Sequence, residues 1–121
     1  MKPKQDLKQR TKLFSLRVIK LVQALPNDKV SAVIAKQLLR SGTSVGANYR
    51  AACRAKSQAD FINKIHISEE EADESLFWME LLTEAEIMEE KRLEELMKEA
   101  NELLAIFSAS VLTAKKNRIK P

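Results

Sequence analysis

Apolar residues recur along this chain at alternating spacings of three and four, the period that gathers them on one face of an α-helix. The pattern falls into four segments, each with one stripe of apolar and small residues. The four stripes are Leu7, Thr11, Phe14, Val18, Leu21 and Leu25; Ile34, Leu38, Ser41, Val45, Asn48 and Ala52; Phe61, Ile65, Ser68, Ala72, Ser75, Met79 and Leu82; and Leu93, Leu96, Ala100, Leu103, Phe107, Ser110 and Ala114. They predict four helices that turn these faces to a shared core.

The residues between the stripes predict where the helices begin and end. Pro26 ends the first helix, and Asn27 or Asp28 is suited to cap the second. Ser57, followed three residues later by Asp60, is a short variant of the capping box and starts the third. We expect helices at about 5–25, 28–55, 57–84 and 89–116, with no strand and no interior linker. The predicted fold is all-α, an antiparallel up-down-up-down four-helix bundle that occupies residues 1–121 as a single domain.

Composition agrees with an all-helical chain, because there are only two glycines and three prolines in 121 residues. No apolar run reaches the roughly 18 residues of a membrane span, and the N-terminal residues lack the apolar stretch of a signal peptide. We therefore expect a cytoplasmic protein with no membrane partner. Cys53 is the sole cysteine, so it forms no internal disulfide, and we expect it to be a buried or half-buried small residue.

Residues 42–46 spell G-x-S-x-G, the motif of a nucleophile elbow, yet the apolar stripe passes through them without losing its helical phase. An elbow serine needs a preceding strand, a histidine base and an acid. The sole histidine, His66, lies in the third segment, and a phosphate loop would need a longer glycine spacing and a following lysine. His66 and Glu70 alone are too few for a metal site. We expect a helix here, no enzymatic activity, and no metal or cofactor.

Two glycines one turn apart inside a helix each cost about 1 kcal/mol relative to alanine, which calls for a packing reason. Gly42 and Gly46 predict that another backbone or a large side chain lies close against the second helix, and Phe77 and Trp78 are the candidate occupants. Asn48, on the core stripe, has two interpretations. It either fixes register in an assembly, or it only bonds a neighbouring backbone group or Ser44.

Charge is strongly segregated along the chain. Residues 1–64 hold fourteen Lys and Arg against Asp6, Asp28 and Asp60, whereas residues 65–112 hold fourteen acids against three bases. The last nine residues are basic again, and the net charge is +4. Basic faces attract phosphates without regard to base sequence, but the same charges can instead neutralise the acidic helices.

The basic residues of the first two helices are the candidate contacts to nucleic acid. We single out Lys36, Arg40, Arg50, Arg54, Lys56, Arg10 and Arg17, while Lys8, Lys12 and Lys20 add to the charge of the first helix. Tyr49 is the one aromatic residue among them. Contact with the phosphate backbone of a nucleic acid is therefore better supported than a platform on which bases stack.

Two stretches carry a resemblance to a known family: QLLRSGTSVGANYRAACRAKSQADFI, from Gln37 to Ile62, and EEEADESLFWMELL, from Glu69 to Leu82. They resemble the four-helix-bundle proteins first recognised in intervening sequences of bacterial 23S ribosomal RNA genes, over about Leu7 to Leu112. The resemblance implies a ring-like homopentamer with no established enzymatic activity and a suspected role in binding nucleic acid. Many relatives carry Glu and Gly where this chain has Ala51 and Ala52, which removes any role of that Glu here.

A protein of similar fold, the accessory variability protein of diversity-generating retroelements, is a basic pentamer that partners a reverse transcriptase. Our hypothesis is a non-enzymatic assembly module, a homopentamer that binds RNA or DNA through basic faces of its first two helices. Its candidate protein partners include a reverse transcriptase. Gly42, Gly46, Asn48, Phe77 and Trp78 are the residues assigned to assembly. The alternative hypothesis is a protein-interaction scaffold without affinity for nucleic acid.

Overall fold

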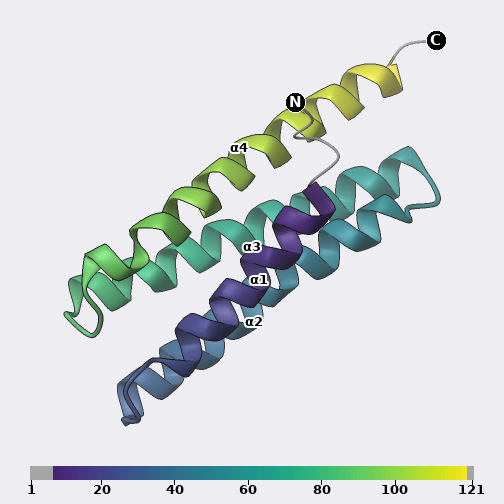
Figure 1. Cartoon of the computed structure of the whole chain (residues 1–121). Helices are drawn as coiled ribbons and strands as arrows, with labels where there is room; N and C mark the ends of the chain where they lie inside the picture. The colour runs from purple at the N-terminus through teal and green to yellow at the C-terminus, as the bar shows by residue number, and fades with distance from the viewer. Residues whose placement is uncertain (1–6, 120–121) are drawn as a thin grey trace.

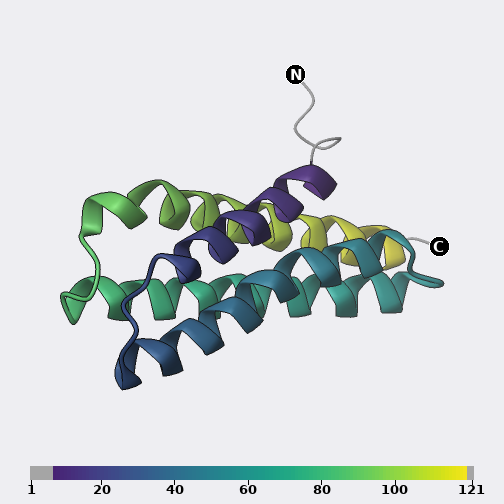
Figure 2. The same ribbon diagram turned by 60° about the horizontal axis from the view of Figure 1, so that its bottom comes forward.

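The computed structural model describes residues 7–119, which form four helices and no strand within that range. These are α1 (Leu7–Gln23), α2 (Lys29–Cys53), α3 (Gln58–Glu84) and α4 (Glu90–Ile119). The helices run alternately up and down, and each packs on the next along the chain (Figures 1 and 2). α1 also meets α4, though less extensively than it meets α2. The predicted all-α four-helix bundle is therefore confirmed.

The turns use the capping residues that the sequence predicts. The Asp28 carboxylate accepts a hydrogen bond from Ser31 N at 2.8 Å, and the Ser57 hydroxyl accepts one from Asp60 N at 3.0 Å. Each cap satisfies a backbone donor that has no partner inside its helix. The ends of α2, α3 and α4 fall within three residues of their predicted positions, whereas the predicted start of the first helix at residue 5 lies outside the described residues.

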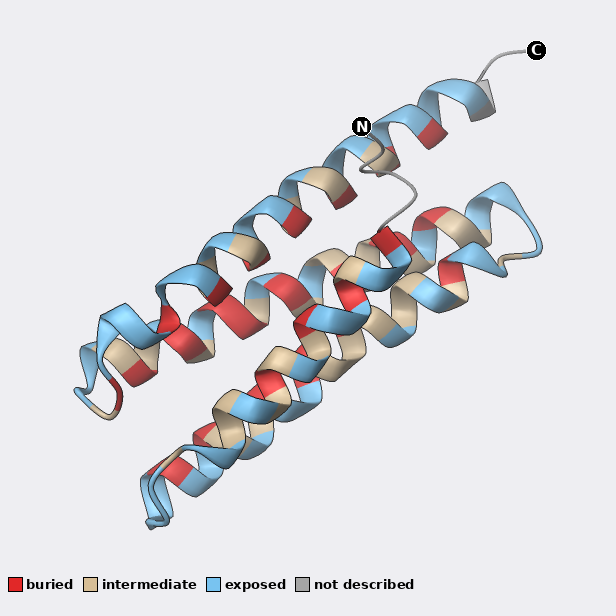
Figure 3. Ribbon diagram, viewed as in Figure 1, coloured by how far each residue is buried: buried red, intermediate tan, exposed pale blue. Residues whose placement is uncertain are grey.

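The four predicted stripes form the hydrophobic core, visible in Figure 3 as red segments turned inward. Nearly all their members are buried, and the half-buried ones are Leu21, Leu25, Asn48, Phe61 and Ser110. Polar members of the core are paired between helices. The Ser41 and Ser75 hydroxyls lie 2.9 Å apart between α2 and α3, and Ser68 donates to the carbonyl oxygen of Val45 at 3.0 Å. These bonds remove the cost of burying hydroxyl groups in an apolar core.

The two glycines of α2 allow α1 to lie close, as the sequence predicts, but the occupant differs from the predicted one. A Cβ atom added at Gly42 would come within 2.7 Å of the Val18 side chain, and one at Gly46 within 3.1 Å of the Thr11 carbonyl oxygen. The Ser15 hydroxyl also donates to the Gly42 carbonyl oxygen at 2.9 Å. α1 therefore fills the space, and the expectation that Phe77 and Trp78 fill it was wrong.

Phe77 and Trp78 lie elsewhere, on the outer part of α3, and contact each other edge to face with ring centroids 5.0 Å apart. The Trp78 indole donates to Glu74 at 3.0 Å. Their position follows from helix geometry, because α3 already turns Ser75, Leu76 and Met79 to the core, which leaves Phe77 exposed and Trp78 half-buried at the edge of the core.

The close approach at Gly42 yields a prediction about stability. Gly42→Ala should lower the free energy of unfolding by about 1–2 kcal/mol, because the overlap with Val18 outweighs the better helix propensity of alanine. In a Val18→Ala background the two closest contacts, with the Cγ atoms of Val18, are removed and only the Cβ contact at 2.9 Å remains, so the same substitution should cost less. Urea unfolding of the four proteins measures both effects. An equal cost in both backgrounds would contradict the close-packing interpretation.

Candidate functional site

Two of the predicted contact residues are engaged in ion pairs inside the bundle. Arg10 of α1 donates to Glu99 of α4 at 2.7 and 3.0 Å, and to Glu102 at 3.0 Å. The Glu99 carboxylate raises the pKa of Arg10. Arg40 of α2 bridges to Glu71 and Glu74 of α3. For Arg10 and Arg40, neutralisation of the acidic helices is therefore the role that the structure supports.

A groove between α1 and α2 gathers a different set of cations. It has a volume of about 440 Å³ and is bordered by Lys8 and Lys12 on α1 and by Arg50 on α2. Its other lining residues are Gln9, Ser15, Thr43, Gly46 and Ala47. No carboxylate lines it, and none of the described acids lies within ion-pair distance of these three cations. The groove is thus a positively charged channel with a small, neutral floor.

The local sequence explains the shape and charge of this groove. Lys8, Lys12 and Ser15 follow each other at spacings of four and three, so they share one face of α1. Thr43, Gly46, Ala47 and Arg50 do the same on α2. Because side chains at 15, 43, 46 and 47 are small or absent, the two helices meet closely at the floor of the groove, beneath the three long basic side chains. Such an arrangement suits a phosphate group, which three cations can approach from the two sides.

The remaining predicted contacts lie outside the groove. Lys36, Arg54 and Lys56 are exposed on α2 and in the turn after it, and Arg17 is half-buried on α1. Of the seven residues singled out from the sequence, the groove contains Arg50 alone. It contains Lys8 and Lys12 instead of Arg10, because Arg10 lies on the side of α1 that faces α4. The spacing of Lys8, Lys12 and Ser15 is the signal that could have identified this face.

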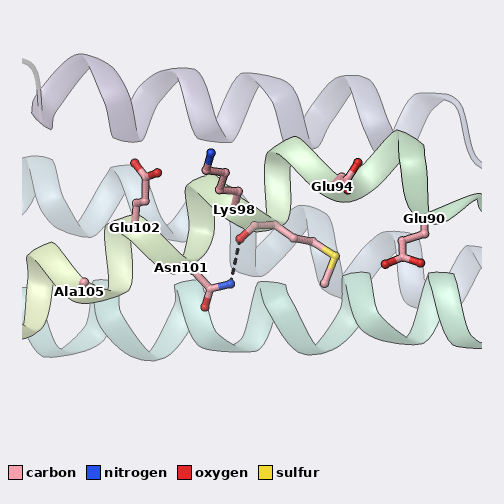
Figure 4. A pocket seen from close by; sticks show the side chains of 7 residues that line it. Glu90, Glu94, Lys98, Asn101, Glu102 and Ala105 are labelled. Atoms are coloured by element: carbon pink, nitrogen blue, oxygen red, sulfur yellow. Dashed lines mark hydrogen bonds between the residues drawn. The ribbon is translucent and has the colours of Figure 1, made fainter.

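The outer face of α4 is opposite in charge to the groove. A shallow hollow of about 590 Å³ runs along it, and Figure 4 shows Glu90, Glu94 and Glu102 beside Lys98 and Asn101. The carboxylates are spaced along one helix and are open to solvent. The carboxylates of this hollow repel phosphate, so it is a less suitable site for a polyanion than the groove between α1 and α2.

The catalytic and metal interpretations of the sequence have little support in the geometry. Ser44 lies inside the continuous helix α2, and its hydroxyl accepts a hydrogen bond from Asn48 at 2.9 Å. His66, on α3, faces Glu69 at 3.3 Å. Within residues 7–119 no three His, Cys, Asp or Glu side chains gather as a metal site, and no helix there is long and apolar enough to cross a membrane. For Asn48, the local bonding to Ser44 is the interpretation that is confirmed.

Tyr49, next to Arg50, is half-buried, and its ring stacks on Phe107 with centroids 6.1 Å apart. Burial, together with the neighbouring Cys53, raises the pKa of Tyr49 to about 12. Cys53 itself is exposed at the end of α2, so the expectation that it is buried or half-buried was wrong. The stripe of α2 explains the difference, since Ala52 takes the core position and turns residue 53 outward.

Tyr49 gives a prediction about pH. Its folded pKa of about 12 lies above the ordinary value of 10.0, so the neutral phenol stabilises the fold fully below pH 10 and this stabilisation is lost as the pH rises through about 12. Tyr49 is the only tyrosine, so tyrosinate absorbance after a rapid pH jump reports it alone. We expect a midpoint near 12 in the folded protein and near 10 in urea. Equal midpoints would contradict the burial of the phenol.

Fold and surface together define a small all-α bundle with a charge-segregated surface and one basic groove. The family model of the 23S rRNA-intervening sequence protein matches residues 4–109, and the chain belongs to this family. It is also similar to a crystal structure from Bacteroides thetaiotaomicron, described as a protein of unknown function from the S23 ribosomal protein family. That match has 38% identity and a TM-score of 0.81, and covers 86% of this chain and 96% of the other. No curated protein matches the chain.

Proposed function

We propose that this protein is a non-enzymatic assembly module that binds the phosphate backbone of RNA or DNA in the groove between α1 and α2. The observation that carries the proposal is the grouping of Lys8, Lys12 and Arg50 around a groove that no carboxylate lines. Arg10 and Arg40, by contrast, are matched with acids of α4 and α3, so the three groove cations differ from them in having no described acid within ion-pair distance.

The electrostatics favour a polyanion as the ligand of this groove. Three cations that approach phosphates displace condensed counterions, and this gain depends on charge and not on base sequence. The membership of the chain in a family named for intervening sequences of 23S rRNA is consistent with a nucleic acid partner.

Binding of labelled single-stranded and duplex RNA and DNA across a salt series tests this function. A variant with Lys8→Glu, Lys12→Glu and Arg50→Glu should lose measurable affinity. If only the charges are removed, by substitution with Gln, the slope of log affinity against log salt should become shallower by about 2–3, since each lost contact removes roughly 0.7–0.9 from it.

The matched control reverses the charge of three exposed basic residues of α4, with Lys91→Glu, Arg92→Glu and Lys116→Glu. It carries the same net charge as the groove variant, so a general electrostatic effect would weaken both equally. We expect the control to bind more tightly than the groove variant by at least tenfold. Equal loss in two folded variants would show that total charge, and not the groove, determines binding.

We also propose that the chain assembles as a homopentamer, as the resemblance to its family implies. Support comes from large apolar side chains that the single chain leaves exposed on several faces. They are Leu13, Leu16, Val30, Val33, Leu39, Phe77 and Leu112. Phe77, 49% exposed, and its neighbour Trp78 are suited to such a contact, because aromatic residues are enriched in protein interfaces. Five copies would repeat the groove fivefold and raise avidity for a long strand.

Sedimentation equilibrium tests the assembly directly. The wild-type protein should sediment at five times the mass of the 13.7 kDa chain. Phe77→Lys should lower the mass or weaken the association, because it places a charge in a contact that excludes water. Lys36→Glu, at an exposed and already charged position of α2, should leave the mass unchanged. A monomeric wild-type protein at high concentration would refute the pentamer.

A protein-interaction scaffold without affinity for nucleic acid is the second candidate function. The exposed apolar side chains and the internal ion pairs of Arg10 and Arg40 favour it. In that case the partner is another protein, of which a reverse transcriptase is one possibility that the family resemblance suggests. Absence of binding to any nucleic acid, even at low salt, would select this alternative.

A further inference from the structure

A second concave site lies at the end of the bundle where α2 ends and α3 begins. It is a cleft of about 570 Å³, a size that holds a small planar molecule, and residues of all four helices line it. The aromatic rings of Tyr49 and Phe61 and the aliphatic side chains of Leu7 and Ile106 provide its apolar surface. The amides of Gln58 and Asn117 provide polar groups.

The cleft and the basic groove are neighbours, because two pairs of consecutive residues are divided between them. Leu7 lines the cleft and Lys8 the groove, and in the same way Tyr49 lines the cleft and Arg50 the groove. Consecutive Cα atoms lie about 3.8 Å apart. The two sites therefore share a border on α1 and on α2, where the backbone that lines the apolar, partly aromatic cleft continues directly into the backbone that lines the phosphate site.

We propose that the cleft accepts an unpaired nucleobase of a strand whose phosphates lie in the groove. This inference rests on the proposed function and extends it, since it makes single-stranded RNA or DNA the substrate class. A base that enters a cleft must leave its stack and its pairing partner, so duplexes would occupy the groove alone.

The chemistry of the cleft fits a base better than a purely apolar ligand. A nucleobase has two apolar faces, which suit aromatic and aliphatic walls, and a polar edge, which requires hydrogen-bonding partners. The Gln58 amide nitrogen donates to the Ala114 carbonyl oxygen at 3.2 Å, which holds that amide in place and leaves its oxygen as an acceptor. Asn117 adds both a donor and an acceptor.

Comparison of two labelled strands of equal length and charge tests the proposal, one with bases and one abasic throughout. Stacking of one base on an aromatic side chain is equivalent to roughly 5- to 150-fold in affinity, so the strand with bases should bind more tightly by that factor. A fluorescent adenine analogue within the strand should be quenched on binding, which a contact with phosphates alone would not produce.

Two substitutions of exposed alanines on α4 provide the variant and its control. Ala109→Phe fills the cleft and should reduce binding of the strand with bases to the abasic level, with an unchanged salt slope. Ala105→Phe lies in the acidic hollow on the outer face of α4 and should change nothing. Circular dichroism establishes that both variants keep the fold.

The outcomes separate this inference from the proposed function. Equal, salt-dependent binding of the base-containing and abasic strands would overturn the base site while leaving the groove as a phosphate site. Unchanged affinity and quenching in a folded Ala109→Phe variant would overturn it as well. Failure of both strands to bind at low salt would refute the proposed function, and the base site with it.

Discussion

The approach of α1 to α2 at residues 42 and 46 is the contact on which the rest of the molecule depends. Val18 packs where a side chain at Gly42 would lie, and the Ser15 hydroxyl reaches the Gly42 carbonyl oxygen. This short distance brings Phe14 and Val18 into the core and sets the width of the groove. The cost of two glycines inside a helix, about 1 kcal/mol each, is offset by the packing that it permits.

Opposite charges in the two halves of the chain serve two different purposes in the folded protein. The pair of Arg10 with Glu99 connects α1 to α4, and the pair of Arg40 with Glu71 and Glu74 connects α2 to α3. Both pairs are partly exposed, so each adds little to stability, but each gives direction to the packing of neighbouring helices. The cations around the groove have no such partner among the described acids, and they make the groove positively charged.

The helices, their caps and the core stripes followed from the sequence because each depends on local spacing, as the burial of Leu38, Ile65 and Phe107 shows. The helix that packs against each buried face did not follow from the sequence, because periodicity shows which face is buried but not which helix covers it. Phe77 and Trp78 were assigned to the glycine patch for this reason, whereas Val18 fills it. Likewise the spacing of Lys8, Lys12 and Ser15 marks a shared face of α1, but only the folded structure shows that Arg10 meets Glu99 of α4.

The light contact between α1 and α4 bears on how the molecule opens. α1 spans 17 residues, the fewest of the four described helices, and relies mostly on α2 for its packing. A helix in that position is the part of a bundle that detaches at the lowest free energy, ahead of global unfolding. Leu7 lines the cleft, and Lys8 and Lys12 line the groove. The cleft and the groove are therefore both lost when α1 detaches. A ligand that needs both would slow amide hydrogen exchange in α1 before it affects α3, through mass action on the docked form.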